Sequence, residues 1–212
     1  MDSIALRLAA IPEYVQLFTD VFGGTNPVTV ENYAKAVATF ERTIVSTNSP
    51  YDKYLAGDLN ALSSDQKNGL ILFNGKARCS NCHYGPMLSD YDFHALGIPE
   101  NPASPLFPAD SGKYKEFKFR TPTLRNATLT GPYMHNGMLE SLKDIVEYMN
   151  AGVSGNSNVT SDMLASDMTP LGLTETEINQ LVAFLESLTD ENFDQIVPTS
   201  VPSGLPVGGN IQ

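Results

Sequence analysis

The sequence predicts a mainly α-helical fold, and three observations carry that prediction. Five segments have apolar residues at three-to-four spacing, which is the period of a helix. Stretches rich in proline and glycine separate them, and these show little periodicity and predict loops. Both cysteines of the chain lie in one short motif at the end of the third predicted helix. We therefore expect a helical domain whose long loops wrap around one local site.

The first two predicted helices lie in the N-terminal 60 residues. Apolar residues recur at helical spacing over residues 14–22, where a glycine pair follows as a stop signal. They recur again over residues 33–44, in a run that begins after Pro27 and ends before the turn-rich segment 48–50. Both runs predict amphipathic helices.

The other three predicted helices each begin with a capping pair, in which a Ser or Thr is followed three residues later by a side chain that can accept from its backbone. The pairs are Ser63 with Gln66, Ser141 with Asp144, and Thr174 with Glu177. Between the third and fourth helices, four prolines in residues 98–119 predict a long surface loop, whose only strand-like piece is residues 117–119. We expect this loop to wrap the edge of the site.

Three regions follow from this order of elements. Residues 1–60 form an N-terminal helical segment that we expect to pack on the next region. Residues 61–190 form the domain that contains the cysteine motif. Residues 191–212 are rich in proline and glycine, and they predict a flexible or strap-like tail.

The charge of the chain limits its partners. The 212 residues include 13 Lys and Arg against 24 Asp and Glu, a net charge of -11. This balance disfavours nucleic acid and anionic membrane surfaces, which attract basic proteins, and it favours a basic protein partner. No apolar stretch reaches the roughly 18 residues needed for membrane insertion, and the N-terminus lacks the pattern of an export signal.

The motif itself reads Cys79-Ser80-Asn81-Cys82-His83. This is the spacing for covalent attachment of a c-type haem, in which two thiols form thioethers and the adjacent imidazole ligates the iron. The sequence thus predicts a c-type cytochrome domain with one haem c, held by Cys79, Cys82 and His83.

Three other interpretations of the motif have less support. A structural zinc site would need two further soft ligands, but the chain has no third cysteine and only two other histidines. A redox dithiol of the thioredoxin type would need a βαβ context, which the flanking sequence lacks. A disulfide that happens to precede a histidine is the third alternative.

The sixth iron position decides between catalysis and electron transfer. Among the seven methionines, Met149 lies on the apolar face of the fourth predicted helix and Met134 lies in the segment 131–137. Spacing alone does not choose between them, and each could also be an ordinary core methionine. His94 and His135 could instead ligate the iron, bond to a propionate or satisfy backbone groups.

Several motifs in the same order resemble the bacterial di-haem cytochrome c peroxidase family and its methylamine-utilisation relatives. The strongest are Phe119-Arg120-Thr121-Pro122-Thr123-Leu124-Arg125-Asn126 and Leu129-Thr130-Gly131-Pro132-Tyr133-Met134-His135-Asn136-Gly137. Shorter matches lie at residues 38–43, 48–52 and 93–97, so the resemblance covers about residues 5–190. It corresponds to the C-terminal half of the family, which contains the electron-transfer haem.

The resemblance implies roles for particular residues. It places the distal methionine at Met149, where the methylamine-utilisation relatives have tyrosine. It also implies a calcium ion bound through the backbone carbonyls of Thr130 and Pro132, although the remaining protein ligand belongs to the family's N-terminal domain. Arg120 and Arg125 would suit pairing with haem propionates, because a guanidinium matches a carboxylate.

The chain departs from the family in having one Cys-x-x-Cys-His motif instead of two. We therefore expect a one-electron carrier with a single His/Met haem, which exchanges electrons with a small redox protein. The alternative is a peroxidase whose second haem domain comes from missing sequence or a partner chain. Because haem c is attached outside the bacterial cytoplasm, we expect a periplasmic or other extracytoplasmic location.

Overall fold

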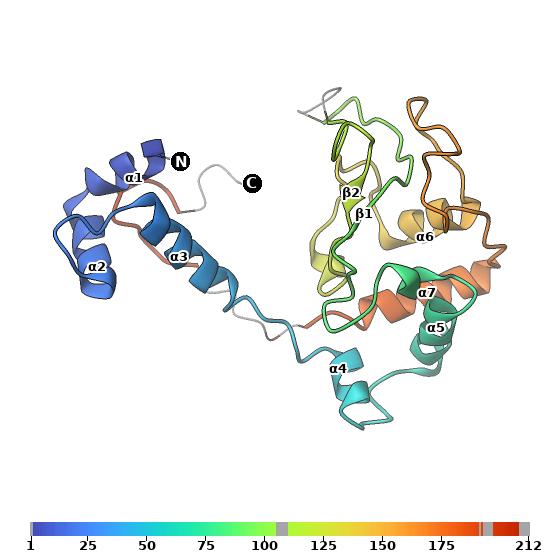
Figure 1. Ribbon diagram of the computed structural model, residues 1–212. Coiled ribbons are helices and arrows are strands. Elements are labelled where there is room, and N and C mark those ends of the chain that lie inside the picture. Colours follow the sequence, from blue (N-terminus) through green and yellow to red (C-terminus); the bar gives the residue numbers. More distant parts are fainter. Residues whose placement is uncertain (1, 105–109, 191, 193–196, 208–212) are drawn as a thin grey trace. The chain divides into compact units, whose positions relative to one another are not determined.

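The computed structural model describes residues 2–104, 110–190, 192 and 197–207 (Figure 1). It divides into two compact units. The first comprises residues 1–45 and 193–212, and the second comprises residues 46–192.

The first unit contains helices α1 (Asp2–Ala9), α2 (Pro12–Phe22) and α3 (Val30–Glu41). The predicted helices at residues 14–22 and 33–44 are confirmed as α2 and α3, although α3 ends three residues early. Helix α1 was not predicted, because eight residues are too few for a clear period. Neither α2 nor α3 has a buried residue.

The second unit contains the remaining helices: α4 (Pro50–Leu55), α5 (Ser64–Asn74), α6 (Leu142–Ala151) and α7 (Glu175–Glu186), with short 3-10 turns at Cys79–Asn81 and Ala127–Leu129. All three predicted capping boxes are present, at the starts of α5, α6 and α7. Helix α4 begins inside the segment 48–50 that predicted a turn. There Ser49 accepts from the backbone N–H of Asp52, whose side chain accepts from the Ser49 N–H, so a fourth capping box starts a helix.

The core of the second unit forms where α5 packs against α7. Phe184 is fully buried, and its ring meets the edges of Tyr51 and Phe73 at centroid distances of 5.3 and 5.0 Å. Gly69 lies at the crossing of the two helices, where a Cβ atom would collide with the backbone carbonyl of Gln180. The absence of a side chain there permits the close approach of α5 and α7.

A small antiparallel sheet joins β1 (Phe93–His94) to β2 (Phe119–Arg120), with Phe93 opposite Arg120. The predicted loop at 98–119 therefore ends in a strand, which begins two residues later and ends one residue later than the strand-like piece predicted at 117–119. Its partner β1 was not predicted, because two residues show no alternation. Residues 105–109 of the loop lie outside the described residues.

Hydrogen bonds tie the two ends of the second unit together. The buried carboxylate of Asp190 accepts from the backbone N–H groups of Thr47 and Asn48, at 3.0 and 2.9 Å. The unit thus starts at Ser46, whereas the predicted domain boundary was at residue 60, and α4 belongs to it. The predicted packing of residues 1–60 on the haem domain stays a prediction.

The predicted tail at 191–212 is described at residue 192 and over residues 197–207, which contain neither helix nor strand. Among the described residues, no helix has the length and apolar character required to cross a lipid bilayer.

Candidate haem-binding site

The cysteine motif follows helix α5 directly and is folded into a tight turn. Arg78 adopts a left-handed conformation (φ 56°), which ends the preceding segment and starts the 3-10 turn Cys79–Asn81. The N–H groups of Cys82 and His83 both donate to the carbonyl of Cys79, at 3.3 and 2.9 Å. This turn brings both thiols and the imidazole to the wall of one cavity.

The cavity has a volume of about 460 Å³, within the range of about 300–1,000 Å³ that is usual for ligand and cofactor sites. All but one of the site residues predicted from the sequence line it: Cys79, Cys82, His83, His94, Arg120, Thr130, Pro132, His135 and Met149. Arg125 is the exception. The structure thus brings together residues that are up to 70 positions apart in the chain.

A hydrogen bond from the ring of His83 to the backbone fixes the orientation of its imidazole. Its Nδ1 lies 2.9 Å from the carbonyl oxygen of Leu88, to which it donates, and this leaves Nε2 for a metal. Burial lowers the pKa of His83 below its ordinary value, against the opposing effects of the Leu88 carbonyl and Asp90. The lowered pKa favours the neutral imidazole, which is the form that binds iron.

Both cysteines are kept as thiols. Burial raises the pKa of Cys79 to about 12. Burial also raises the pKa of Cys82, and the nearby carboxylates of Asp90, Asp167 and Asp92 add to this effect. Because the thiolate is the reactive form in disulfide exchange, a raised pKa disfavours that form of both cysteines.

Three methionines line the cavity. Met149 lies on α6, as predicted, and the other two are Met134 and Met168. Met134 has a left-handed backbone (φ 68°), and Met168 is almost fully buried. No sequence pattern marks Met168, because this residue lies in the non-periodic segment between α6 and α7.

The two other histidines each have a defined partner. His94 Nε2 lies 2.7 Å from Asp90 Oδ2. The ring of His135 stacks on Phe119, with centroids 3.5 Å apart and planes inclined by 9°. Burial lowers the pKa of His135, although Asp110 opposes the shift.

Arg125 has partners other than the predicted propionate. Its guanidinium forms two hydrogen bonds of 3.0 Å with the carboxylate of Asp52 and also donates to the carbonyls of Ser46 and Pro86. These contacts, together with its position outside the cavity wall, give Arg125 a structural role. Arg120 does line the cavity, and its guanidinium lies 4.8 Å from the ring centroid of Tyr91.

Arg78 is a cavity residue that the sequence reasoning missed. Its Nη2 donates to the carbonyl and hydroxyl of Thr169, at 3.0 and 2.8 Å. Its Nε is buried and has no hydrogen-bond partner among the described residues. A buried N–H without an acceptor is costly, so an acceptor on a bound group is expected here.

These residues fit a covalently attached haem. The cavity wall offers two thiols for the vinyl groups, the imidazole of His83, methionine sulfurs and the unsatisfied Nε–H of Arg78. Thr130 and Pro132 also lie at the wall, and their predicted role as calcium ligands stays a prediction.

Comparisons with known proteins agree with this chemistry. A family model described as "Di-haem cytochrome c peroxidase" matches residues 1–60. A cytochrome-c peroxidase from Denitromonas iodatirespirans is 41% identical over 87% of this chain and 56% of its own length. The methylamine utilization protein MauG from Methylorubrum extorquens is 37% identical over 90% of this chain and 53% of its own length.

This chain belongs to the di-haem cytochrome c peroxidase family. The chain spans about half the length of the curated family members that it matches. It has two cysteines in total and thus a single haem attachment motif.

The fold also matches a solved structure related to this family. A crystal structure of a MauG-like protein associated with microbial copper homeostasis superposes with a TM-score of 0.73 and 28% identity, covering 90% of this chain and 62% of that chain. The mostly helical architecture with a two-stranded sheet is therefore the fold of MauG-like proteins.

Proposed function

We propose that this chain is a one-electron carrier with a single haem c, attached through Cys79 and Cys82 and ligated by His83 and Met149. The observation that carries the proposal is the cavity whose wall holds all four of these residues. When bound, a c-type haem supplies a ferric/ferrous couple.

The protein residues fix the properties of that couple. His83 presents Nε2 because Leu88 occupies its Nδ1. Met149 offers a thioether from a helix whose start is fixed by the Ser141–Asp144 capping box. A methionine ligand raises the potential and fills the position that peroxide would need, so this ligand pair favours electron transfer over catalysis.

Three variants test the ligand assignment. Met149→Ala should convert the ferric optical spectrum from low spin to high spin and remove the weak near-infrared band of methionine ligation. Met134→Ala and Met168→Ala, which change the other two methionines of the cavity wall, should leave both features intact. If either control loses the band while Met149→Ala keeps it, the assignment to Met149 is wrong.

A second candidate function, reduction of hydrogen peroxide, is favoured by the names of the family members that this chain matches. It would require a second haem domain, from sequence beyond this chain or from a partner chain. Steady-state peroxide consumption with a reduced cytochrome or cupredoxin donor separates the two functions. Turnover by the purified chain alone, unaffected by Met149→Ala, would contradict the carrier proposal.

The proposed location is periplasmic or otherwise extracytoplasmic, because haem c is attached there. The net charge of -11 supports a basic redox partner. The rate of electron exchange with such a partner should fall as ionic strength rises.

A further inference from the structure

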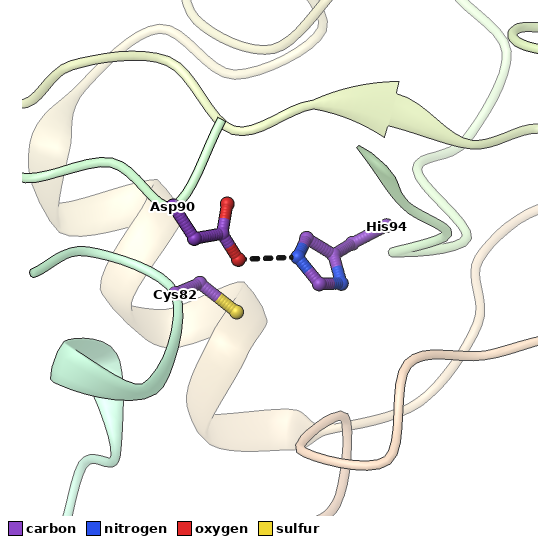
Figure 2. Close-up of side chains that lie close together, drawn as sticks. All are labelled: Cys82, Asp90 and His94. Carbon is purple, nitrogen blue, oxygen red and sulfur yellow. Dashed lines mark hydrogen bonds and ion pairs between the residues drawn. The ribbon is translucent and has the colours of Figure 1, made fainter. Parts of the chain in front are cut away.

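Cys82 belongs to a second cluster besides the haem motif. Cys82, Asp90 and His94 form a group in which one ligand atom of each residue lies within 4.8 Å of the others (Figure 2). Within it, His94 Nε2 lies 2.7 Å from Asp90 Oδ2. The three residues come from the end of the cysteine turn, the following loop and strand β1. Thiolate sulfur, imidazole nitrogen and carboxylate oxygen are the three donor types that zinc binds in proteins.

The backbone holds this cluster in place. The N–H of Asp90 donates to the carbonyl of Cys82 at 2.8 Å. The N–H of Asp92 donates to Asp90 Oδ1 at 2.9 Å, which leaves Oδ2 for His94. His94 is fixed in turn by the pairing of β1 with Phe119 on β2. The side chains of His94 and Asp90 keep 27% and 10% of their surface exposed, so an ion can reach them from solvent.

The arrangement fits a cation better than a nucleophilic triad. In a triad, the carboxylate and the thiol contact opposite nitrogens of the imidazole. Here Asp90 contacts Nε2, and Figure 2 shows the other ring nitrogen of His94 on the side away from Asp90. Cys82 Sγ also lies on the Nε2 side of the ring, so the three donors converge on one region of space.

We propose that the chain, before haem attachment, binds a zinc-class divalent cation through Cys82, Asp90 and His94, and that this cation competes with haem for the sulfur of Cys82. The binding site stands on the geometry alone, whereas the competition rests on the proposed haem attachment.

Cation binding and thioether formation both use the sulfur of Cys82, so they cannot occur there together. Cation binding releases the thiol proton of Cys82 to solvent and forms a metal–sulfur bond. Thioether formation adds the S–H across a vinyl C=C bond, so that a C–S and a C–H bond replace the S–H bond and the π bond, with no net oxidation. The alkylated sulfur no longer offers a thiolate.

Coordination requires the three donor atoms to move to zinc–ligand distances. Zinc lies about 2.0–2.2 Å from nitrogen and oxygen ligands and about 2.3 Å from sulfur. Tetrahedral nitrogen and oxygen ligands at such distances are about 3.3 Å apart, so Asp90 Oδ2 and His94 Nε2 must separate by about 0.6 Å from 2.7 Å. A sulfur ligand lies about 3.5 Å from the other two, so any donor pair near the 4.8 Å limit of the cluster must also move closer together. The three protein ligands leave the fourth position to water, as in open zinc sites.

Calorimetric titration of zinc chloride into the full haem-free chain, kept reduced, tests the site. We expect one zinc per chain, and affinity reduced about tenfold or more in Cys82→Ser, Asp90→Asn and His94→Asn. Two matched controls, Cys79→Ser and Asp92→Asn, make the same chemical changes at neighbouring positions and should bind as the unmodified chain does. Equal losses in Cys79→Ser and Cys82→Ser would mean a simple Cys-x-x-Cys chelate and would overturn the proposal, as would the absence of binding.

An absorption measurement identifies the sulfur ligand independently of the titration. Cobalt(II) in place of zinc should show a sulfur-to-metal absorption band in the unmodified chain and in Asp92→Asn. Loss of this band in Cys79→Ser, or its survival in Cys82→Ser, contradicts the assigned sulfur.

Measurements on the haem-bound chain distinguish failure of the zinc proposal from failure of the proposed haem function. A pyridine haemochrome spectrum and the intact mass report covalent haem independently of zinc. With haem attached, zinc affinity should fall at least about tenfold, and unchanged affinity would refute the competition. If no haem attaches, the proposed function fails while the titration of the haem-free chain still decides the zinc site.

Discussion

Arg78 stands immediately before Cys79, the first cysteine of the proposed haem-attachment motif, and combines two unusual features. Its backbone is left-handed, a conformation that disfavours most side chains. Its guanidinium is anchored to Thr169 on one side, while its Nε is buried and unsatisfied at the cavity wall. Strain and an orphan donor in one residue indicate a role towards the bound group.

We predict that Arg78→Gln lowers the reduction potential of the haem-bound chain. A nearby positive charge disfavours the ferric state, which has one more positive charge than the ferrous state. The expected fall is up to about 59 mV, the value for a tenfold change in a one-electron equilibrium. Potentiometric titration measures it. Lys67→Gln, the same loss of charge outside the cavity wall, is the control, and an equal shift in both variants would contradict the role.

A site residue could be predicted from the sequence where the pattern that identifies it consists of residues close to it in the chain. Cys79, Cys82 and His83 are adjacent in sequence, so their chemistry is readable without a fold. Arg78 and Met168 were missed, because what marks them is contact with segments far along the chain. Arg125 was assigned to a propionate because a guanidinium suits any carboxylate, and the structure supplies Asp52 instead.

Among the elements, α5 positions the cysteine motif and depends on its contact with α7. Gly69 lies at that contact, where an added Cβ would collide with the carbonyl of Gln180. The capping boxes of α5, α6 and α7 were correctly predicted, because a cap involves residues only three apart. The fourth box, at Ser49 and Asp52, was read as a turn because Pro50 follows Ser49, although proline is common in the first turn of a helix.

Gly69→Ala should destabilise the protein although alanine favours helices. The helix propensity gains about 1 kcal/mol, whereas overpacking of a tight contact typically costs about 1–3 kcal/mol. A Cβ at this position meets the backbone of α7, which has little freedom to move, so we expect a net loss. Denaturant unfolding measures it. Asn68→Ala, on the exposed side of the same helix, should be neutral or slightly stabilising, and a similar loss there would point to a general effect on α5.

At the scale of the whole molecule, every residue that lines the cavity lies within residues 46–192. We predict that this unit, expressed alone, attaches one haem and gives the same optical spectrum as the full chain. Intact mass and absorption spectra provide the measurement. A haem-binding unit with a high-spin spectrum would show that residues 1–45 or 193–212 are needed to complete the site.

The stability of this unit should decline in acid in a way that depends on Asp190. Burial raises the pKa of Asp190, but hydrogen bonds from the N–H groups of Asn192, Asn48 and Thr47 outweigh it, so the pKa is lowered. A lowered folded-state pKa gives stability that is present above the unfolded value of about 3.9 and lost as pH falls through the folded value.

Thermal unfolding between neutral pH and pH 3 tests this dependence. Asp190→Asn should lower Tm at neutral pH, and the difference from the unmodified chain should shrink as the pH falls below about 4. Glu13→Gln, an exposed carboxyl in α2, should follow the unmodified chain throughout. A difference that stays constant with pH would mean that Asp190 acts through packing alone.

The bonds from Asp190 to Thr47 and Asn48 also determine how the molecule responds to force. Thr47 and Asn48 lie at the start of residues 46–192 and Asp190 lies near their end, so tension applied to the chain from both sides acts across these two hydrogen bonds. The hydrogen bond from Arg125 to the carbonyl of Ser46 holds the entering segment as well. These contacts resist separation of the two ends of residues 46–192 and so oppose the transmission of tension to the α5–α7 core.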